Sequence, residues 1–351
     1  MMKMKTNYDV VALKEFAVKT GLHCESSAMM NALAYQGVNL SESMITGLGS
    51  APAFFFKTDD AFPFLGERSH TMLEDFCTST GIRVESASPK TRQEAYDAVK
   101  DVLKQGIPVA LRVNMRYLPY LHGGQYGDKY TSFGWHYVCL VGIDEPRGIA
   151  SVTDTAFSVL QEVKLTDLAR ARAAKEGMFR TENFYYYFIQ PSSVAIDSRS
   201  AFQRSIKTLI GNYEAPGAGL NALEKLPDDI MNIEKGRKVF ILQPLFYTFY
   251  GYIEEFGTGG AGFRNFLKKY YYEMAEILGI GDLKKTAAIV DNACAEWTAL
   301  ALSFKNISET IKSKDGAERT MMYQNTADIA RRLFVAEKNI YDAIKSVHAD
   351  I

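Results

Sequence analysis

Residues 134–154 read GWHYVCLVGIDEPRGIASVTD and carry a strong strand signal. The run from His136 to Ile143 is almost wholly apolar, as expected of a strand that is buried in a sheet. Pro146-Arg147-Gly148 has the composition of a turn, and residues 149–154 supply a returning strand. This stretch therefore predicts an antiparallel β-hairpin.

Helices and strands alternate around this hairpin in the first 191 residues. Helical composition is found at 25–35, 69–78 and 91–104, with Ser69 as a plausible N-cap and glycines just past the ends of the first and third segments. Strand patterns are found at 82–86, at 108–113 and in the aromatic run FYYYFIQ, 184–190. We expect an α+β domain with an antiparallel sheet over residues 1–191.

The remainder of the chain has a different composition. Seven of the ten prolines fall in residues 1–191, and none follows Pro244. Apolar residues recur there at three- and four-residue spacing, the pattern of amphipathic helices. Helices are expected at 198–213, 254–278 (broken by FGTGGAGF), 283–305 and 317–347. We expect an all-α domain over residues 192–351.

Composition restricts the class of protein. The 351 residues include 40 Lys+Arg and 41 Asp+Glu, and this balance argues against a protein that binds the nucleic-acid backbone. The longest apolar stretch, 239–253, is interrupted by Gln243 and Pro244 and is shorter than the ~20 residues of a membrane-spanning helix. With no targeting segment visible, we expect a soluble cytoplasmic protein with reduced thiols and no membrane partner.

Cys24 is the first candidate for chemistry. It lies where a loop ends and a helix begins, and the unpaired N–H groups and positive dipole end of a helix favour the nucleophilic thiolate. The same N–H groups can hold a developing oxyanion. The alternative is a small buried hydrophobe. That alternative is preferred for the other three cysteines, which have helical or strand surroundings: Cys77, Cys139 and Cys294.

A catalytic thiol needs a base, and His136 is the best placed of the five histidines. It begins an apolar strand directly after a glycine-containing loop, although a histidine buried in the core is the alternative reading. A tight hairpin brings His136 beside Asp154, whose carboxylate can orient the imidazole and stabilise the imidazolium. Asp144 is the rival, but it lies at the turn end of the hairpin. The expected constellation is Cys24, His136 and Asp154.

These residues carry a resemblance. The run HCESSAMMNALAYQGVNLSESMITGLG, 23–49, resembles the opening of the butirosin-biosynthesis H protein (BtrH-like) N-terminal family, and weaker matches follow in GIPV (106–109), YLPY (117–120) and GWHYVCLVGID (134–144). Residues 254–279 resemble the helical domain of unknown function that commonly follows it. The N-terminal part is also similar to bacteriocin-processing, papain-like cysteine peptidases.

The resemblance implies a papain-like fold and an acyltransferase that moves an acyl group from a carrier-protein thioester to an amine. Carried over, Cys24 is the nucleophile, His136 the general base and Asp154 its orienter. Papain-like peptidases place a Gln shortly before the Cys as an oxyanion donor, whereas Asp9 to Leu22 contain neither Gln nor Asn. The donor is then a backbone N–H or His23. This departure weakens the peptidase interpretation more than the transferase one.

Other residues are candidates for substrate contact. The loop 114–134 is rich in aromatic residues, among them Tyr126 and Tyr130, and is either a lid or a packed surface loop. Arg264 follows the glycine-rich break and either meets a carrier phosphate or an acidic substrate or is an ordinary surface arginine. The substrate-binding candidates are His23, Tyr117, Tyr120, Trp135 and Arg264. No metal-binding spacing is present, so we expect no metal and no cofactor beyond phosphopantetheine on the donor.

The leading hypothesis is a biosynthetic acyltransferase that acts through acyl-Cys24. Its expected partners are an acyl-carrier protein or acyl-CoA donor and a small amine acceptor. A papain-like peptidase or amide hydrolase is the enzyme alternative, and a non-catalytic binding protein on the same fold is the third. The long helices of the C-terminal part are compatible with a homodimer or with a self-contained bundle.

Overall fold

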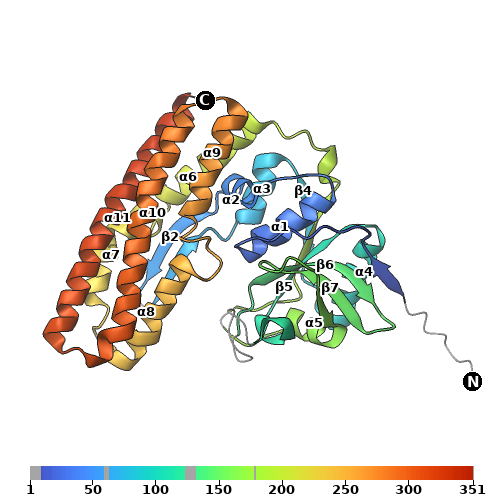
Figure 1. The fold of residues 1–351 in the computed structure, drawn as a ribbon, viewed down its shortest axis with the longest axis horizontal. Helices are drawn as coiled ribbons and strands as arrows, with labels where there is room; N and C mark the ends of the chain where they lie inside the picture. The colour runs from blue at the N-terminus through green and yellow to red at the C-terminus, as the bar shows by residue number, and fades with distance from the viewer. Residues whose placement is uncertain (1–8, 59–62, 123–131, 178, 351) are drawn as a thin grey trace, which may run out of the picture. The chain divides into compact units, whose positions relative to one another are not determined.

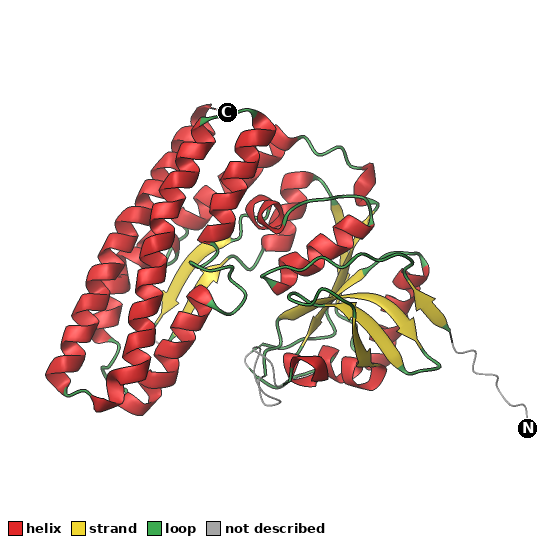
Figure 2. Cartoon of the chain, in the orientation of Figure 1, coloured by secondary structure: helices red, strands yellow, loops and turns green. Residues whose placement is uncertain are grey.

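The structure is a computed structural model that describes residues 9–58, 63–122, 132–177 and 179–350 (Figures 1 and 2). The contacts divide the chain into two compact units. The first contains residues 1–42 and 82–195, and the second contains residues 43–81 and 196–351. The chain therefore passes from the first unit to the second, returns, and leaves again.

A seven-stranded antiparallel sheet forms the first unit. Its main order is β4-β9-β5-β6-β7-β8, and β1 pairs with β6 beside this path. The strands are β1 Val10–Ala12, β4 Arg83–Ala87, β5 Val109–Val113, β6 His136–Asp144, β7 Ile149–Thr153, β8 Gln161–Lys164 and β9 Tyr185–Ile189. Strand β6 has neighbours on both sides and is buried from His136 to Ile143, which explains its nearly continuous apolar sequence.

Three helices pack on this sheet (Figure 2). Helix α1, Cys24–Tyr35, lies against β5, β6 and β9 and is buried almost all round, so its apolar residues form no single stripe. Helix α4, Arg92–Lys104, begins with a capping box between Thr91 and Glu94, and α5 spans Leu165–Arg172. Short 3₁₀ turns are η1 Met115–Tyr117, η2 Pro119–Leu121 and η3 Pro191–Ser193.

The second unit is helical apart from one hairpin, β2 Pro52–Lys57 and β3 Phe64–Arg68. Helices α6, α7 and α8 contact this hairpin, and α10 packs against α8, α9 and α11 (Figure 1). The helices are α2 Glu42–Leu48, α3 Met72–Thr80, α6 Ser198–Glu214, α7 Gly219–Asn232, α8 Val239–Glu254, α9 Arg264–Leu278, α10 Asp282–Thr310 and α11 Gly316–Asp350, with η4 at Ile311–Ser313. No described helix is both long and apolar enough to cross a bilayer.

The expected α+β class, with an antiparallel sheet before a helical C-terminal part, is confirmed. The division into 1–191 and 192–351 stays a prediction, and the contacts group residues 43–81 with the C-terminal helices. The apolar stretch 239–253 is helix α8. The expected N-cap at Ser69 is wrong, because its hydroxyl bonds to Thr71 and helix α3 begins at Met72.

Candidate active site

Cys24 is the first residue of α1 and is half-buried. The preceding residue, His23, has an extended backbone, and its Nδ1 accepts the Ser26 N–H at 3.3 Å, which caps the helix. The Cys24 N–H has no hydrogen-bond partner among the described residues. Thiol and free N–H therefore lie together at the positive end of a helix.

His136 and Asp154 meet at one end of the β6–β7 pair. His136 is the first residue of β6, and Asp154 directly follows the last residue of β7. The Nε2 of His136 lies 2.9 Å from each carboxylate oxygen of Asp154, and both residues are buried. Nε2 is engaged by the carboxylate, which leaves Nδ1 as the ring nitrogen for another partner. The Cys24 sulfur is close enough to the ring to contribute to the raised pKa of His136.

The electrostatics favour a charged imidazole. Burial disfavours the cation, but the Asp154 carboxylate and the Cys24 sulfur outweigh this effect and raise the pKa of His136 from 6.5 to about 10. An imidazolium at neutral pH is the partner that a cysteine thiolate requires. The arrangement can therefore hold a thiolate–imidazolium pair.

Tyr120 completes the surroundings of the carboxylate. Its hydroxyl donates to Asp154 Oδ2 at 2.9 Å, and its ring packs edge-on against Phe157. The sequence suggested Tyr120 as a substrate contact, whereas here it anchors the carboxylate that orients His136. The rival carboxylate, Asp144, lies at the turn and accepts the backbone N–H of Arg147 at 3.0 Å.

The loop that precedes Cys24 is held by Glu42, which the sequence analysis did not single out. Its carboxylate accepts the backbone N–H groups of Leu22 and His23 and the hydroxyl of Ser26, each at 2.8 Å. The N–H of Gly21 donates to the Thr155 carbonyl at 2.7 Å, which joins the nucleophile loop to the segment after Asp154. The only feature of the sequence that pointed to Glu42 was the Ser41-Glu42 pair within the run 23–49 that carries the family resemblance.

Trp135 lies beside the thiol. Its carbonyl oxygen is 3.8 Å from Cys24 Sγ, and its ring stacks on Phe179 with centroids 4.7 Å apart. Phe133 packs edge-on against the Phe179 ring. A Cβ at Gly134 would approach the Phe179 carbonyl oxygen to 1.9 Å, so only glycine fits between these aromatic residues. Trp135, Phe133 and Phe179 are half-buried and form an aromatic cluster, which meets the Cys24 thiol through the Trp135 carbonyl.

Two of the substrate-binding candidates in this unit have other contacts. The Tyr117 hydroxyl donates to Glu176, and its ring lies under the Arg170 guanidinium at 4.6 Å. His23 is 5% exposed, and its ring caps α1. Tyr126 and Tyr130 lie outside the described residues.

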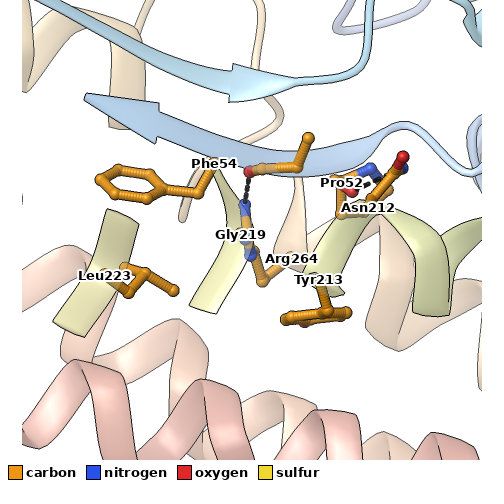
Figure 3. A pocket seen from close by; sticks show the side chains of 8 residues that line it. Pro52, Phe54, Asn212, Tyr213, Gly219, Leu223 and Arg264 are labelled. Carbon is orange, nitrogen blue, oxygen red and sulfur yellow. Dashed lines mark hydrogen bonds between the residues drawn. The ribbon is translucent and has the colours of Figure 1, made fainter. Parts of the chain in front are cut away.

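Arg264 belongs to the second unit and is 1% exposed (Figure 3). Its Nε donates to the Glu337 carboxylate at 2.8 Å, and its Nη1 donates to the carbonyls of Ala53 and Gly262. The guanidinium also lies 4.6 Å from the ring of Trp297. The expectation of a surface or substrate-binding arginine is wrong, because these groups enclose the side chain.

The other cysteines have apolar surroundings. Burial raises the pKa of the Cys77 and Cys294 thiols to about 12 and also raises that of Cys139. None of these three interacts with a histidine among the described residues, in contrast to Cys24. No three His, Cys, Asp or Glu side chains of the described chain gather in a way that could hold a metal ion.

Two family models match the chain. The model of butirosin biosynthesis protein H, N-terminal, matches residues 23–155, and the model of a domain of unknown function (DUF4872) matches residues 166–344, just over half of the chain. A search of curated proteins finds no significant match. The second match begins within the first unit and includes β9, which pairs with β4 and β5. The chain therefore belongs to the biosynthesis-related enzyme family that joins a butirosin biosynthesis protein H N-terminal domain to this domain of unknown function.

Proposed function

We propose that the protein is a cysteine-dependent acyltransferase that moves an acyl group from a thioester to an amine. The observation that carries the proposal is the position of the Cys24 thiol, between the N-terminus of α1 and an imidazole that Asp154 holds. The donor we propose is an acyl-carrier protein or acyl-CoA, and the acceptor is a small amine of a biosynthetic pathway.

The first step is thioester exchange. The Cys24 thiolate attacks the carbonyl carbon of the donor, and the carbon–sulfur bond to the donor breaks as the new one to Sγ forms. The departing thiolate takes the proton of the His136 imidazolium, which leaves neutral imidazole and acyl-Cys24. One thioester replaces another, so the step is close to balanced in free energy.

The second step transfers the acyl group to nitrogen. The amine attacks the acyl-Cys24 carbonyl, His136 accepts the amine proton, and Sγ leaves as thiolate. This restores the thiolate–imidazolium pair. In both steps the free Cys24 N–H is the group placed to donate to the oxygen that becomes negative.

Transfer competes with hydrolysis, because water also attacks an acyl-cysteine. The aromatic cluster of Trp135, Phe133 and Phe179 meets the thiol through the Trp135 carbonyl, and we propose that it limits the approach of water to the acyl-cysteine. An amide hydrolase would use the same three groups with water as the acceptor. The two functions therefore differ in the acceptor rather than in the nucleophile.

The test measures the release of free thiol from an acyl-CoA series and from acyl-carrier protein, with and without a panel of primary amines. We expect thiol release to be accelerated by the correct amine and matched mole for mole by amide product. Cys24→Ala should abolish it, whereas Cys139→Ala, a buried thiol in the same unit, should retain it. Thiol release that forms only free acid, together with cleavage of amide substrates, would favour the hydrolase.

A further inference from the structure

Glu67 is a carboxylate of the second unit that has no cation of its own. It lies on β3 and is half-buried. Its carboxylate accepts its own backbone N–H, and no described side chain forms a hydrogen bond or an ion pair with it. Burial outweighs the attraction of Arg68 and Arg264 and raises the pKa of Glu67 from 4.5 to about 7. A cation that reaches this carboxylate therefore stabilises its charged form.

The two arginines near Glu67 have other partners. Arg264 is held by Glu337, and the Nη1 of Arg68 donates to the Ser69 carbonyl at 3.3 Å. Glu67 itself is only half-buried, and neither of its oxygens is a sealed polar atom without a partner, in contrast to the hydroxyl of Tyr271. The carboxylate is therefore open to a ligand from solvent.

A row of aromatic rings lies beside this carboxylate. Phe64 meets Tyr252 edge-on with centroids 5.4 Å apart, and Tyr252 meets Phe256 edge-on at 5.8 Å. Phe64 and Tyr252 are half-buried, and Phe256 is 52% exposed. Burial and the negative charge of Glu67 together raise the pKa of Tyr252 to about 12, and no hydrogen bond joins the two side chains. The phenol thus lies near the carboxylate without occupying it.

The glycine-rich segment packs against the stem of Glu67. A Cβ at Gly262 would lie 3.3 Å from the Cβ of Glu67 and 3.7 Å from its Cγ. Gly262 is fixed in turn, because its N–H donates to the Ile253 carbonyl at 2.9 Å. The stem of Glu67 is therefore held by neighbouring backbone, which keeps the carboxylate near Tyr252.

We propose that Glu67 and the rings of Phe64, Tyr252 and Phe256 form a binding site for the primary ammonium group of a small organic amine. The carboxylate accepts hydrogen bonds from the ammonium, and the rings attract the same cation and contact its carbon chain. A divalent metal does not fit, because no three His, Cys, Asp or Glu side chains gather in the described part of the chain. This inference concerns binding by the second unit and does not depend on acyl transfer.

The site combines residues from both matched family models. Phe64 and Glu67 lie in the stretch that matches the butirosin biosynthesis protein H model, whereas Tyr252 and Phe256 lie in the stretch that matches the domain of unknown function. Neither stretch alone supplies both the carboxylate and the rings of the α8 region. The packing of the β2–β3 hairpin on the C-terminal helices therefore assembles the site.

The test measures the binding of butylammonium to the full chain by saturation-transfer NMR, with butanol as the neutral analogue. We expect saturable binding of butylammonium that is at least about 10-fold tighter than that of butanol. Glu67→Gln should remove this difference, whereas Glu74→Gln, at an exposed carboxylate of the same unit, should keep it. Tyr252→Leu should weaken the binding about 3-fold and Tyr252→Phe should not, because only the first variant loses the ring.

The ionisation of Glu67 gives a second readout. The site needs the carboxylate, and an alkylamine stays protonated near neutral pH as lysine does. With the pKa of Glu67 at about 7, the affinity should rise about 10-fold from pH 6 to pH 8. Cys24→Ala should bind butylammonium as the unchanged protein does, which separates this site from the proposed acyl transfer.

A measurement on the unchanged protein protects the test against variants that fail to fold. The Glu67 carboxyl carbon of ¹³C-labelled protein should titrate with a midpoint near pH 7, and saturating butylammonium should lower this midpoint to about 6 or below. Sodium chloride at the same ionic strength should not lower it. Equal binding of butanol and butylammonium, tight binding retained in Glu67→Gln, or an unchanged midpoint would overturn the proposal.

Discussion

Each unit buries one carboxylate that holds a cation and accepts a tyrosine hydroxyl. In the first unit Asp154 holds His136 and accepts from Tyr120. In the second unit Glu337 holds Arg264 and accepts from Tyr213 at 2.7 Å, and also from the indole N–H of Trp297. Both clusters contain a carboxylate, a cation and a tyrosine hydroxyl. They differ in the groups that the cation contacts besides the carboxylate.

The cluster around Glu337 is closed. The remaining Arg264 donors reach backbone carbonyls, and every named member of the cluster is buried. The cluster around Asp154 instead leads through the His136 ring to the half-buried thiol of Cys24. We expect a buried ion pair whose hydrogen-bonding groups all have partners to contribute to the stability of the fold. A buried ion pair that leaves one ring nitrogen for an accessible thiol can instead take part in proton transfer.

The largest expected effect is a loss of activity when the cluster around Asp154 is changed. His136→Ala should lower kcat/KM by about 10³-fold, because both proton transfers lose their carrier. Thermal unfolding should show that the variant stays folded, and His122→Ala provides the control with a histidine outside the cluster. A fall of less than 10-fold would show that His136 is not the base.

The closed cluster should respond in stability rather than in activity. Arg264→Met leaves the Glu337 carboxylate buried without its cation and should lower the free energy of unfolding by about 3–5 kcal/mol. Arg331→Met, at an exposed arginine of α11, should change it by less than about 0.5 kcal/mol. Urea unfolding followed by Trp297 fluorescence in a Trp135→Phe background reports on the second unit. The activity of the folded fraction should be unchanged.

The two tyrosines give the matched pair for the comparison. Tyr120→Phe removes a donor from Asp154 and should lower kcat roughly 10-fold, because the carboxylate then holds His136 less firmly. Tyr213→Phe removes the equivalent donor from Glu337 and should cost about 1–3 kcal/mol of stability with no change in kcat. Steady-state kinetics and urea unfolding of both variants check this. A loss of stability without a change in kcat in Tyr120→Phe, together with a loss of kcat in Tyr213→Phe, would contradict the distinction between the two clusters.

The smallest expected effect concerns pH. The raised pKa of His136 means that the imidazolium and its ion pair are fully present below the ordinary value of 6.5 and are lost as pH rises through about 10. Activity should therefore change by no more than about 2-fold between pH 8 and 9. In Asp154→Asn the alkaline loss should move to lower pH, whereas Asp144→Asn should keep the profile of the unchanged protein. The kcat/KM profile from pH 5 to 10.5 measures this.

Most of the fold followed from local patterns in the sequence. The hairpin of β6 and β7 was predictable because an apolar run, a Pro-Arg-Gly turn and a returning strand lie next to one another. The association of β2 and β3 with the C-terminal helices was not, because it depends on contacts between residues far apart in the sequence, such as Pro52 of β2 with Asn212 of α6, 160 positions away. A local pattern holds no information on such contacts.

The candidate site was also predictable only where it depends on residues that are close in the sequence. The proximity of His136 and Asp154 was predicted from hairpin geometry. Cys24 was singled out by its place at a helix start, and its association with the other two residues came from the chemistry of cysteine nucleophiles and the family resemblance. The roles of Tyr120, Glu42 and Phe179 depend on side-chain direction across loops, which spacing alone does not determine. Arg264 was misread for this reason, since nothing local to FGTGGAGFR shows that its side chain turns into the core toward Glu337, 73 residues away.

The most direct test of acyl transfer through Cys24 is the intact mass of the protein after brief exposure to acyl thioesters without amine. We predict a single acyl adduct that maps to Cys24, is absent in Cys24→Ala and disappears with amide formation when the amine is added. The Cys77→Ala variant should form the same adduct. An adduct retained in Cys24→Ala, or amide formation by that variant at the rate of the unchanged protein, would contradict the account.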